Sequence, residues 1–469
     1  MQYDVNSLFF SEPRGRSWII DSWEDETARA TSARQTTESL SIIFYSSARD
    51  CVCYPKGSGY LKSDFKEPLK LSIHQITMRF LSLLFLLQLL VVSGYCQVKP
   101  ARQLKVITIS GTGYERGLQH GKQLKKEIAE LMLIWKKDLE VNGKRPAEKL
   151  LTEFLANTSF TDASKKYTSD IFEEVRGMAA GSGQSFDDMF AFQLVDEYWV
   201  YADKKHYDSI NHHCSGIGIP ARNGKMAYVS QNMDLSTWMD GYQVMMHVKQ
   251  NGDTPEQYVF TCAGLIGLNG VNRSGIGVCV NTLMQLSASS DGLPVAFMIR
   301  GLLAQKKGSD ALTFLQSTKH ASGQNYILGV VDSVYDFEAS AQKVVRMKAD
   351  NSGIVYHTNN PVANNDIKPW YSDYYQRYLA GNTKNNNSEI RFANLTRRLA
   401  EPGVKNDIFI KSVLRSKDDP KNPVCRANGP GKNVFTFGSA ILTLSGKPSM
   451  QVTAGPPDES DYATFSFDK

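Results

Sequence analysis

Hydrophobic and polar positions follow two different patterns along the chain. Between residues 111 and 200, apolar side chains recur three or four positions apart, as in Leu124, Ile128 and Leu131. This spacing is typical of amphipathic helices. Only a short β-rich run, residues 104–109, precedes them. The region is therefore predicted to be mainly helical, with its helices covering a sheet.

The pattern changes after residue 214 to short β-rich segments separated by turn residues. Asn223-Gly224 lies between two such segments, and Asn251-Gly252 lies between the next two. Asn-Gly between alternating segments is a strong signal for a β-hairpin. A third pair of segments turns at residues 272–275. Three successive hairpins are therefore predicted.

The rest of the chain combines a helical stretch with further strands. Residues 294–319 are predicted to be helical, with Ser309 or Asp310 as an N-cap. The polar stretch 380–389 is predicted to be a surface loop. Further strands are predicted at 325–333, 334–340, 343–349 and 353–360, and a closing hairpin at 435–444 and 448–455. Together these elements predict an α+β fold with one core and no internal repeats.

The first 96 residues differ from the rest. Met78-Arg79 is followed by the apolar run Phe80–Val92 and a small-residue exit, so residues 78–96 are predicted to be a secretory signal peptide. The run is too short for a membrane span of ~20 residues. Met78 is hypothesised to be the true start, with 1–77 a mis-called or disordered extension; a leader ahead of a signal anchor is the alternative. The mature protein is then secreted or periplasmic, with no stable membrane span.

Composition narrows the classes of function. The chain of 469 residues is 42% hydrophobic and 22% charged, which is typical of a globular protein. Its formal charge of +5 is slight and no run of lysine and arginine stands out, so nucleic acid is not an expected partner. Seven cysteines without a CxxC pair do not suggest a zinc ribbon. After export, four of them could pair with one another, and the sequence leaves this open: Cys214, Cys262, Cys279 and Cys425.

The stretch NHHCSGIGIP around Cys214 carries the main candidate for chemistry. Zinc accepts cysteine and histidine, and the candidate ligands are His206, His212, His213 and Cys214. The adjacent His212 and His213 would point to opposite faces of an extended chain, however, and no HExxH motif accompanies them. A papain-like site needs its cysteine at a helix start, whereas a glycine-broken strand follows here. It would also need one of three downstream histidines: His247, His320 or His357. A buried structural cysteine is the remaining alternative.

The neighbours of Cys214 resemble a known family. In order along the chain they are GTGYERGLQHG, the strand opened by Cys214, QNMD at 231–234, AGLIGLNGVNRSGIGVCVN at 263–281, YHTNN at 356–360 and VCRANGP…FTFGSAIL near 424–442. This order is similar to that of the peptidase C45 family, the acyl-coenzyme A:6-aminopenicillanic acid acyltransferase type of N-terminal-nucleophile (Ntn) hydrolase. The resemblance covers residues 104–467.

The resemblance implies an αββα sandwich of two antiparallel sheets between helical layers, and a precursor that cuts itself before its cysteine. That bond is His213–Cys214, which divides the mature protein into a light chain, 97–213, and a heavy chain, 214–469, forming one domain and remaining associated. It also implies Asp234 and Asn359 as catalytic partners, with Asn281 and Asn232 as pocket candidates. The family often has glycine where His213 stands and an aromatic residue where Met233 stands. No cofactor or metal is implied.

The predicted reaction is cleavage of a small N-acyl amide through an acyl-Cys214 thioester, with water or an amine as acceptor. A thiolate nucleophile, an α-amine base and a carboxamide oxyanion donor are chemically suited to this. Two alternatives stay open. One is a bile-salt or acyl-homoserine-lactone type of Ntn amidase, and the other is a catalytically inactive binding protein on the same scaffold.

Overall fold

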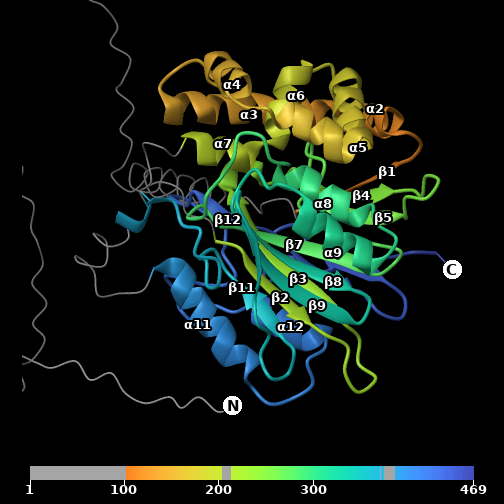
Figure 1. The fold of residues 1–469 in the computed structure, drawn as a ribbon, viewed down its shortest axis with the longest axis vertical. Coiled ribbons are helices and arrows are strands. Elements are labelled where there is room, and N and C mark those ends of the chain that lie inside the picture. The colour runs from red at the N-terminus through yellow and green to blue at the C-terminus, as the bar shows by residue number, and fades with distance from the viewer. Residues whose placement is uncertain (1–101, 203–212, 370, 374–385, 469) are drawn as a thin grey trace, which may run out of the picture. The chain divides into compact units, whose positions relative to one another are not determined.

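The computed structural model describes residues 102–202, 213–369, 371–373 and 386–468 (Figure 1). The chain divides into two compact units, Met1–Cys96 and Gln97–Lys469, and every described residue belongs to the second. The predicted signal peptide and the extension before it lie outside the described residues. Within the described ranges, no helix is both long and apolar enough to cross a membrane.

Two β-sheets form the centre of the described unit. Sheet A contains, in spatial order, β1 (Lys105–Ile109), β4 (Gln243–Val248), β5 (Gln257–Cys262), β6 (Asn269–Asn272), β7 (Ile276–Thr282), β8 (Gln324–Val330), β9 (Ser333–Ala339) and β10 (Val344–Arg346). Sheet B contains β11 (Val355–His357), β2 (Ser215–Ile219), β3 (Tyr228–Ser236), β12 (Val434–Thr443), β13 (Ser449–Val452) and β14 (Ala463–Ser466). All neighbouring strands are antiparallel except β1 and β4, which are parallel.

The predicted hairpins are confirmed. Strands β2 and β3 pair from Ser215↔Asn232 to Ile219↔Tyr228, with Asn223-Gly224 at the turn. Both turn residues have positive φ, 50° and 72°, which is the backbone that a two-residue hairpin turn requires and that Asn-Gly favours. The pairs β4–β5 and β6–β7 follow as predicted, and β12–β13 closes the chain as expected before the additional strand β14.

The two sheets face each other at close range because glycines line the contact. A Cβ atom on Gly329 of β8 would lie 2.1 Å from Leu444 and 2.8 Å from Val229, and one on Gly216 of β2 would lie 2.8 Å from Ile327. The alternation in SGIGI follows from this contact. Gly216 and Gly218 face sheet A, whereas the isoleucines between them face the other way, into a second hydrophobic cluster.

One helical layer covers sheet A, as the sequence predicts (Figure 1). Its N-terminal helices are α2 (Gly113–Gln123), α3 (Lys125–Gly143), α4 (Ala147–Ala156), α5 (Phe160–Ser182), α6 (Phe186–Gln193) and α7 (Val195–Ala202). The stretch 294–319 forms α8 (Val295–Leu303) and α9 (Gly308–Ser317). The predicted N-cap of α9 is wrong. Lys307 occupies that position, and Ser309 and Asp310 lie in the first turn, where an acidic side chain still suits the helix dipole.

The second layer covers the outer face of sheet B and contains two helices that the sequence did not predict. They are α11 (Asn387–Leu399) and α12 (Asp407–Leu414). The prediction of a loop over 380–389 is wrong at its C-terminal end. Asn386 caps α11 in a capping box with Glu389, so these polar residues begin a helix. With α11 and α12 in place, the predicted αββα sandwich is confirmed.

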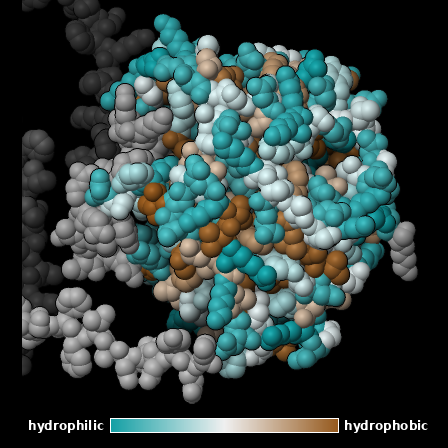
Figure 2. All heavy atoms as spheres, viewed as in Figure 1, coloured by the Kyte–Doolittle hydropathy of each residue, from teal (hydrophilic) through white to brown (hydrophobic). Residues whose placement is uncertain are grey.

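Buried hydrophobic residues form a main cluster and a smaller one between sheet B, α11 and α12. The face drawn in Figure 2 is mostly hydrophilic, with apolar patches between polar side chains. All four cysteines in the described ranges are buried free thiols: Cys214, Cys262, Cys279 and Cys425.

Candidate active site

Cys214 lies directly before β2 and points into the space between the sheets. Its side chain is 5% exposed. Its Sγ atom lies 3.6 Å from Met233 Sδ and 3.9 Å from the carbonyl oxygen of Asp234. Burial, together with the negative charge of Asp234, raises the pKa of the Cys214 thiol to about 12. The thiol of the uncut chain is therefore protonated at neutral pH and needs a base before it can attack.

The histidines available for the rival interpretations have other partners. His213 Nδ1 lies 2.9 Å from Asn387 Oδ1. His247 bonds Glu256, His320 bonds the Leu315 carbonyl, and His357 bonds Glu338. Within the described ranges, no group of three or more His, Cys, Asp and Glu side chains is arranged to hold a metal ion. His206 and His212 lie outside those ranges.

Asp234 lies on β3 one position after Met233 and points to the opposite face of the sheet. Thr436 Oγ1 donates a hydrogen bond of 2.7 Å to Asp234 Oδ1. Arg426 Nε lies 3.2 Å from Oδ2 without an aligned hydrogen bond. Burial raises the pKa of Asp234 to about 6 although Arg426 opposes the shift. The carboxylate thus has spare hydrogen-bonding capacity, and its negative charge acts on the Cys214 thiol.

Arg391 connects the cysteine with Asn359 and was missed in the sequence. Its Nη1 donates to the Cys214 carbonyl oxygen and, at 3.0 Å, to Ser215 Oγ, and its Nη2 donates to Asn359 Oδ1 at 3.0 Å. The side chain is 0% exposed. Burial lowers the pKa of Arg391 to about 9, so it remains a cation at neutral pH. The available signal was an arginine on the same buried stripe of α11 as Leu395.

The carboxamide of Asn359 is held in one orientation. Its oxygen accepts from Arg391, and its Nδ2 donates to the Thr282 carbonyl oxygen at 3.1 Å. Because an amide nitrogen carries two hydrogens, one N–H remains for a further acceptor. The backbone N–H of Asn359 donates to Ser388 Oγ at 2.7 Å. This arrangement suits a donor to an oxyanion.

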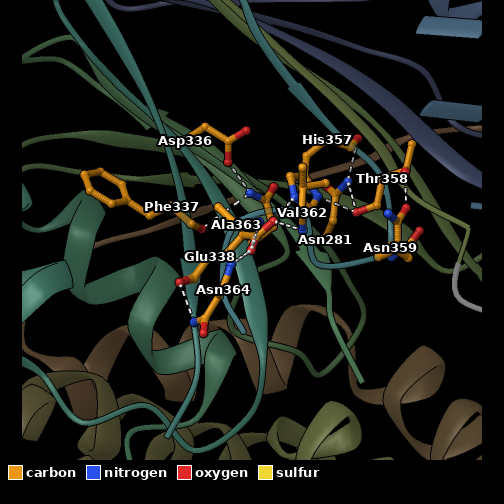
Figure 3. Close-up of polar contacts among 12 residues, drawn as sticks. Asn281, Asp336, Phe337, Glu338, His357, Thr358, Asn359, Val362, Ala363 and Asn364 are labelled. Carbon is orange, nitrogen blue, oxygen red and sulfur yellow. Dashed lines mark hydrogen bonds and ion pairs between the residues drawn. The ribbon is translucent and has the colours of Figure 1, made fainter. Parts of the chain in front are cut away.

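The two pocket candidates have structural contacts. Asn281 Nδ2 donates to the carbonyl oxygens of His357 and Thr358 at 2.9 and 3.1 Å (Figure 3). Asn281 therefore supports the segment that carries Asn359. Asn232 Nδ2 donates to the carbonyl oxygens of Leu414 and Val424 at 2.7 and 2.9 Å. These two hydrogen bonds connect α12 and the segment after it to sheet B.

Comparison with known families is consistent with this geometry. Residues 221–425 match the family model of acyl-coenzyme A:6-aminopenicillanic acid acyl-transferase. Over this segment, the chain is similar to that family. The matched segment contains Asp234, Asn281, Asn359 and Arg391 and begins after Cys214. No protein with a curated description matches the chain significantly.

Several solved structures are remotely similar to the present chain. A Caenorhabditis elegans N-acylethanolamine-hydrolyzing acid amidase ortholog is 15% identical with a TM-score of 0.35, covering 54% of this chain and 100% of its own. A variant of Clostridium perfringens conjugated bile acid hydrolase is 12% identical with a TM-score of 0.32, covering 55% and 97%. Penicillin V acylase from Agrobacterium tumefaciens is 13% identical with a TM-score of 0.35, covering 54% and 86%. These likenesses are too distant to assign an activity.

The raised pKa of Asp234 predicts a pH-dependent loss of stability in the uncut chain. The ordinary pKa of an aspartate, 3.8, represents the unfolded state, and the pKa of Asp234 in the folded state is about 6. The folded state therefore holds the proton more tightly. This contribution to the free energy of unfolding is fully present below the unfolded pKa and is lost as the pH rises through about 6. At 1.36 kcal/mol per pKa unit, the loss is roughly 3 kcal/mol.

Urea unfolding between pH 4 and 7 measures this contribution. A Cys214→Ala chain serves as the reference because it cannot cut itself through a thiol. Adding Asp234→Asn is expected to make the free energy of unfolding fall less steeply between pH 4 and 6. Equal slopes in the two variants would show that Asp234 does not titrate in this interval.

Proposed function

We propose that the protein is a self-processing cysteine amidohydrolase of the N-terminal-nucleophile type. The observation that carries the proposal is the chain of contacts from Cys214 through Arg391 to Asn359, with Asp234 adjacent. These groups come from four separate parts of the chain and meet at the start of β2. The matched family and this arrangement together support acyl transfer from an amide to a thiol.

In the proposed maturation step, Cys214 Sγ attacks the carbonyl carbon of His213. The carbon–nitrogen bond breaks, a thioester forms, and the proton of the thiol passes to the departing nitrogen of Cys214. Water then hydrolyses the thioester, which releases the carboxyl group of the light chain and leaves Cys214 with a free α-amine. An α-amine has a reference pKa of about 7.7–8.0, so it can serve as a base near neutral pH.

In the proposed catalytic cycle, the α-amine accepts the proton of the Cys214 thiol as sulfur attacks the substrate amide carbon. The free N–H of Asn359 donates to the oxyanion that forms. When the carbon–nitrogen bond breaks, the ammonium returns its proton to the leaving amine. Water then attacks the acyl-thioester and releases the acid. The Asp234 carboxylate holds the ammonium in place between these steps.

Hydrolysis is proposed in preference to transfer to an added amine. The chain is expected to be exported, and its sequence contains no evident coenzyme A site, so water is proposed as the acceptor. The proposed substrate is a small N-acyl amide, and the proposed state is a light and a heavy chain that remain associated.

Intact-mass spectrometry with N-terminal sequencing of the purified protein tests the maturation. Two fragments are expected, the larger starting at Cys214. A panel of N-acyl amides, assayed with and without an acyl-thioester donor, then tests the reaction. Release of acid without a donor supports hydrolysis, whereas turnover only with the donor would assign the protein to acyl transfer. A single uncut chain would contradict the proposed base.

Replacing Asn359 by alanine is expected to lower kcat by about 10²–10³-fold, because one donor to the oxyanion is lost. KM is expected to change little. Asn428→Ala serves as the control because the Asn428 amide bonds Asp240 at 2.8 Å and has no part in the proposed reaction. Steady-state kinetics of both variants measure the difference. An equal effect of both substitutions would remove the proposed oxyanion donor.

A further inference from the structure

A buried ion pair lies where sheets A and B meet, next to the segment that carries Asn359. Glu338 is on β9 of sheet A, and His357 ends β11 of sheet B (Figure 3). Both side chains are 0% exposed, and His357 Nε2 lies 2.8 Å from Glu338 Oε1. The proposed reaction mechanism assigns no role to either group.

The Glu338 carboxylate accepts three backbone hydrogen bonds besides the one from His357. Val362 N donates to Oε1 at 2.6 Å, and Ala363 N and Asn364 N donate to Oε2 at 2.9 and 2.5 Å. In addition, Asn364 Nδ2 donates to the Glu338 carbonyl oxygen at 3.1 Å. One side chain therefore organises the backbone of residues 362–364.

The hydrogen bonds of His357 require a charged imidazole. Its Nε2 faces a carboxylate and its Nδ1 lies 2.7 Å from the Thr358 carbonyl oxygen. Both partners are acceptors only, so both ring nitrogens must carry a proton. Burial opposes this charge, but Asp336 and Glu338 raise the pKa of His357 above its usual value. His357 and Glu338 thus form a buried ion pair.

Asn359 lies between the two points that Glu338 holds. On one side is His357, bound through its ring, and on the other are residues 362–364, bound through their amides. The segment between them is short and includes Thr358, whose carbonyl oxygen accepts from both His357 and Asn281. A donor to an oxyanion works only if it is already in place when charge develops. Residues on both sides of Asn359 are thus hydrogen-bonded to the Glu338 carboxylate, and the position of Asn359 depends on them.

We propose that Glu338 is the positioning residue for Asn359, acting by holding both ends of segment 357–364. This inference rests on the proposed function, in which Asn359 donates to the oxyanion. Glu338 contacts neither Cys214 nor substrate in this proposal, so it acts only through Asn359.

Glu338→Gln is the sharpest test because glutamine keeps the shape of the side chain. It replaces one acceptor oxygen with an NH₂ group, which in either orientation faces at least one backbone N–H of residues 362–364 and cannot accept from it. Glu256→Gln is the matched control. Glu256 also pairs with a histidine, His247, at 2.6 Å, and binds Lys249 and Arg273.

Two measurements are made on the full mature protein. Steady-state kinetics compare Glu338→Gln in the wild-type and Asn359→Ala backgrounds. We expect kcat to fall about 10- to 100-fold in the wild-type background with KM nearly unchanged, and no further fall in the Asn359→Ala background. Hydrogen exchange compares the backbone amides of residues 357–364. We expect Glu338→Gln to make them exchange faster, while Glu256→Gln leaves both kcat and these amides unchanged.

An equal loss of kcat in both backgrounds would overturn the proposal, since Glu338 would then act independently of Asn359. Unchanged exchange at residues 357–364 would also overturn it, and this readout does not depend on catalysis. The proposed function fails differently: turnover that survives Cys214→Ala would remove the thiol mechanism whatever Glu338 does. Rescue of kcat by Glu338→Asp would support a requirement for the carboxylate at this place.

Discussion

Replacing Cys214 by alanine is expected to give a single uncut chain without measurable amidase activity. The substitution removes both the sulfur that attacks the His213 carbonyl and the nucleophile of the proposed reaction. Without cleavage, the α-amine base is not released either. Loss of a catalytic nucleophile costs up to about 10⁶-fold in kcat in a hydrolase whose groups act as a unit. Intact mass and turnover are measured on the same sample.

Cys262→Ala is the matched control for this prediction. Cys262 is a buried thiol at the end of β5, and burial raises its pKa far above the usual value, so it is not expected to react. This variant should be cut and active. A fluorescent thiol reagent should label the wild-type heavy chain at Cys214 and leave Cys214→Ala unlabelled. Cleavage that persists in Cys214→Ala would contradict self-processing by the thiol, and labelling elsewhere would favour the inactive scaffold.

Replacing Glu174 by glutamine is expected to destabilise the protein by about 3–5 kcal/mol, the usual cost of breaking a buried ion pair from one side. Glu174, on α5, is 0% exposed and binds two arginines. Arg116 Nε of α2 lies 2.8 Å from it, and Arg300 Nη1 of α8 lies 2.6 Å from it. Glutamine would leave both guanidinium groups buried without a carboxylate between them. Arg300 is therefore in a buried ion pair.

Denaturant unfolding at pH 7 measures the loss, with Cys214→Ala as the reference so that every sample is one chain. The exposed neighbour Glu173, 3.1 Å from Arg176, provides the control. Glu173→Gln is expected to cost less than about 1 kcal/mol, as surface ion pairs do. Similar losses in the two variants would show that the buried cluster contributes no more than a surface pair.

The pH dependence of this contribution has a defined sign. The two arginines overcome the opposing effect of burial and lower the pKa of Glu174 to about 2. Because the pKa is lower in the folded state, Glu174 stabilises the fold at pH values above the unfolded pKa of 4.5, and this stabilisation is lost as the pH falls toward 2.

Glu174 lies on the predicted light chain and Arg300 on the predicted heavy chain. The same pair would therefore hold the two chains together after cleavage.

The local pattern of the sequence was sufficient for much of the fold. Asn223-Gly224 identified the first hairpin because its turn needs two residues with positive φ, and this depends on neighbours alone. The helical spacing from Leu124 onward was equally informative. Helix α11 was missed because the polar residues around Asn386 also suit a loop. Asn386 and Glu389 begin a helix there because the apolar side of α11 is buried against sheet B.

The sequence also offered Cys214 as the candidate nucleophile, and the family resemblance added Asp234 and Asn359, whose residue types suit thiol chemistry. It did not identify Arg391 or Glu338. Arg391 reaches Cys214 across 177 positions of the chain, and Glu338 reaches His357 across 19. An arginine or a glutamate has no local pattern that reveals such a partner, because the contact exists only after the two sheets and α11 have packed. Residue types and short spacings thus determined the strands, the hairpins and the candidate nucleophile, and tertiary packing decided which charged groups surround it.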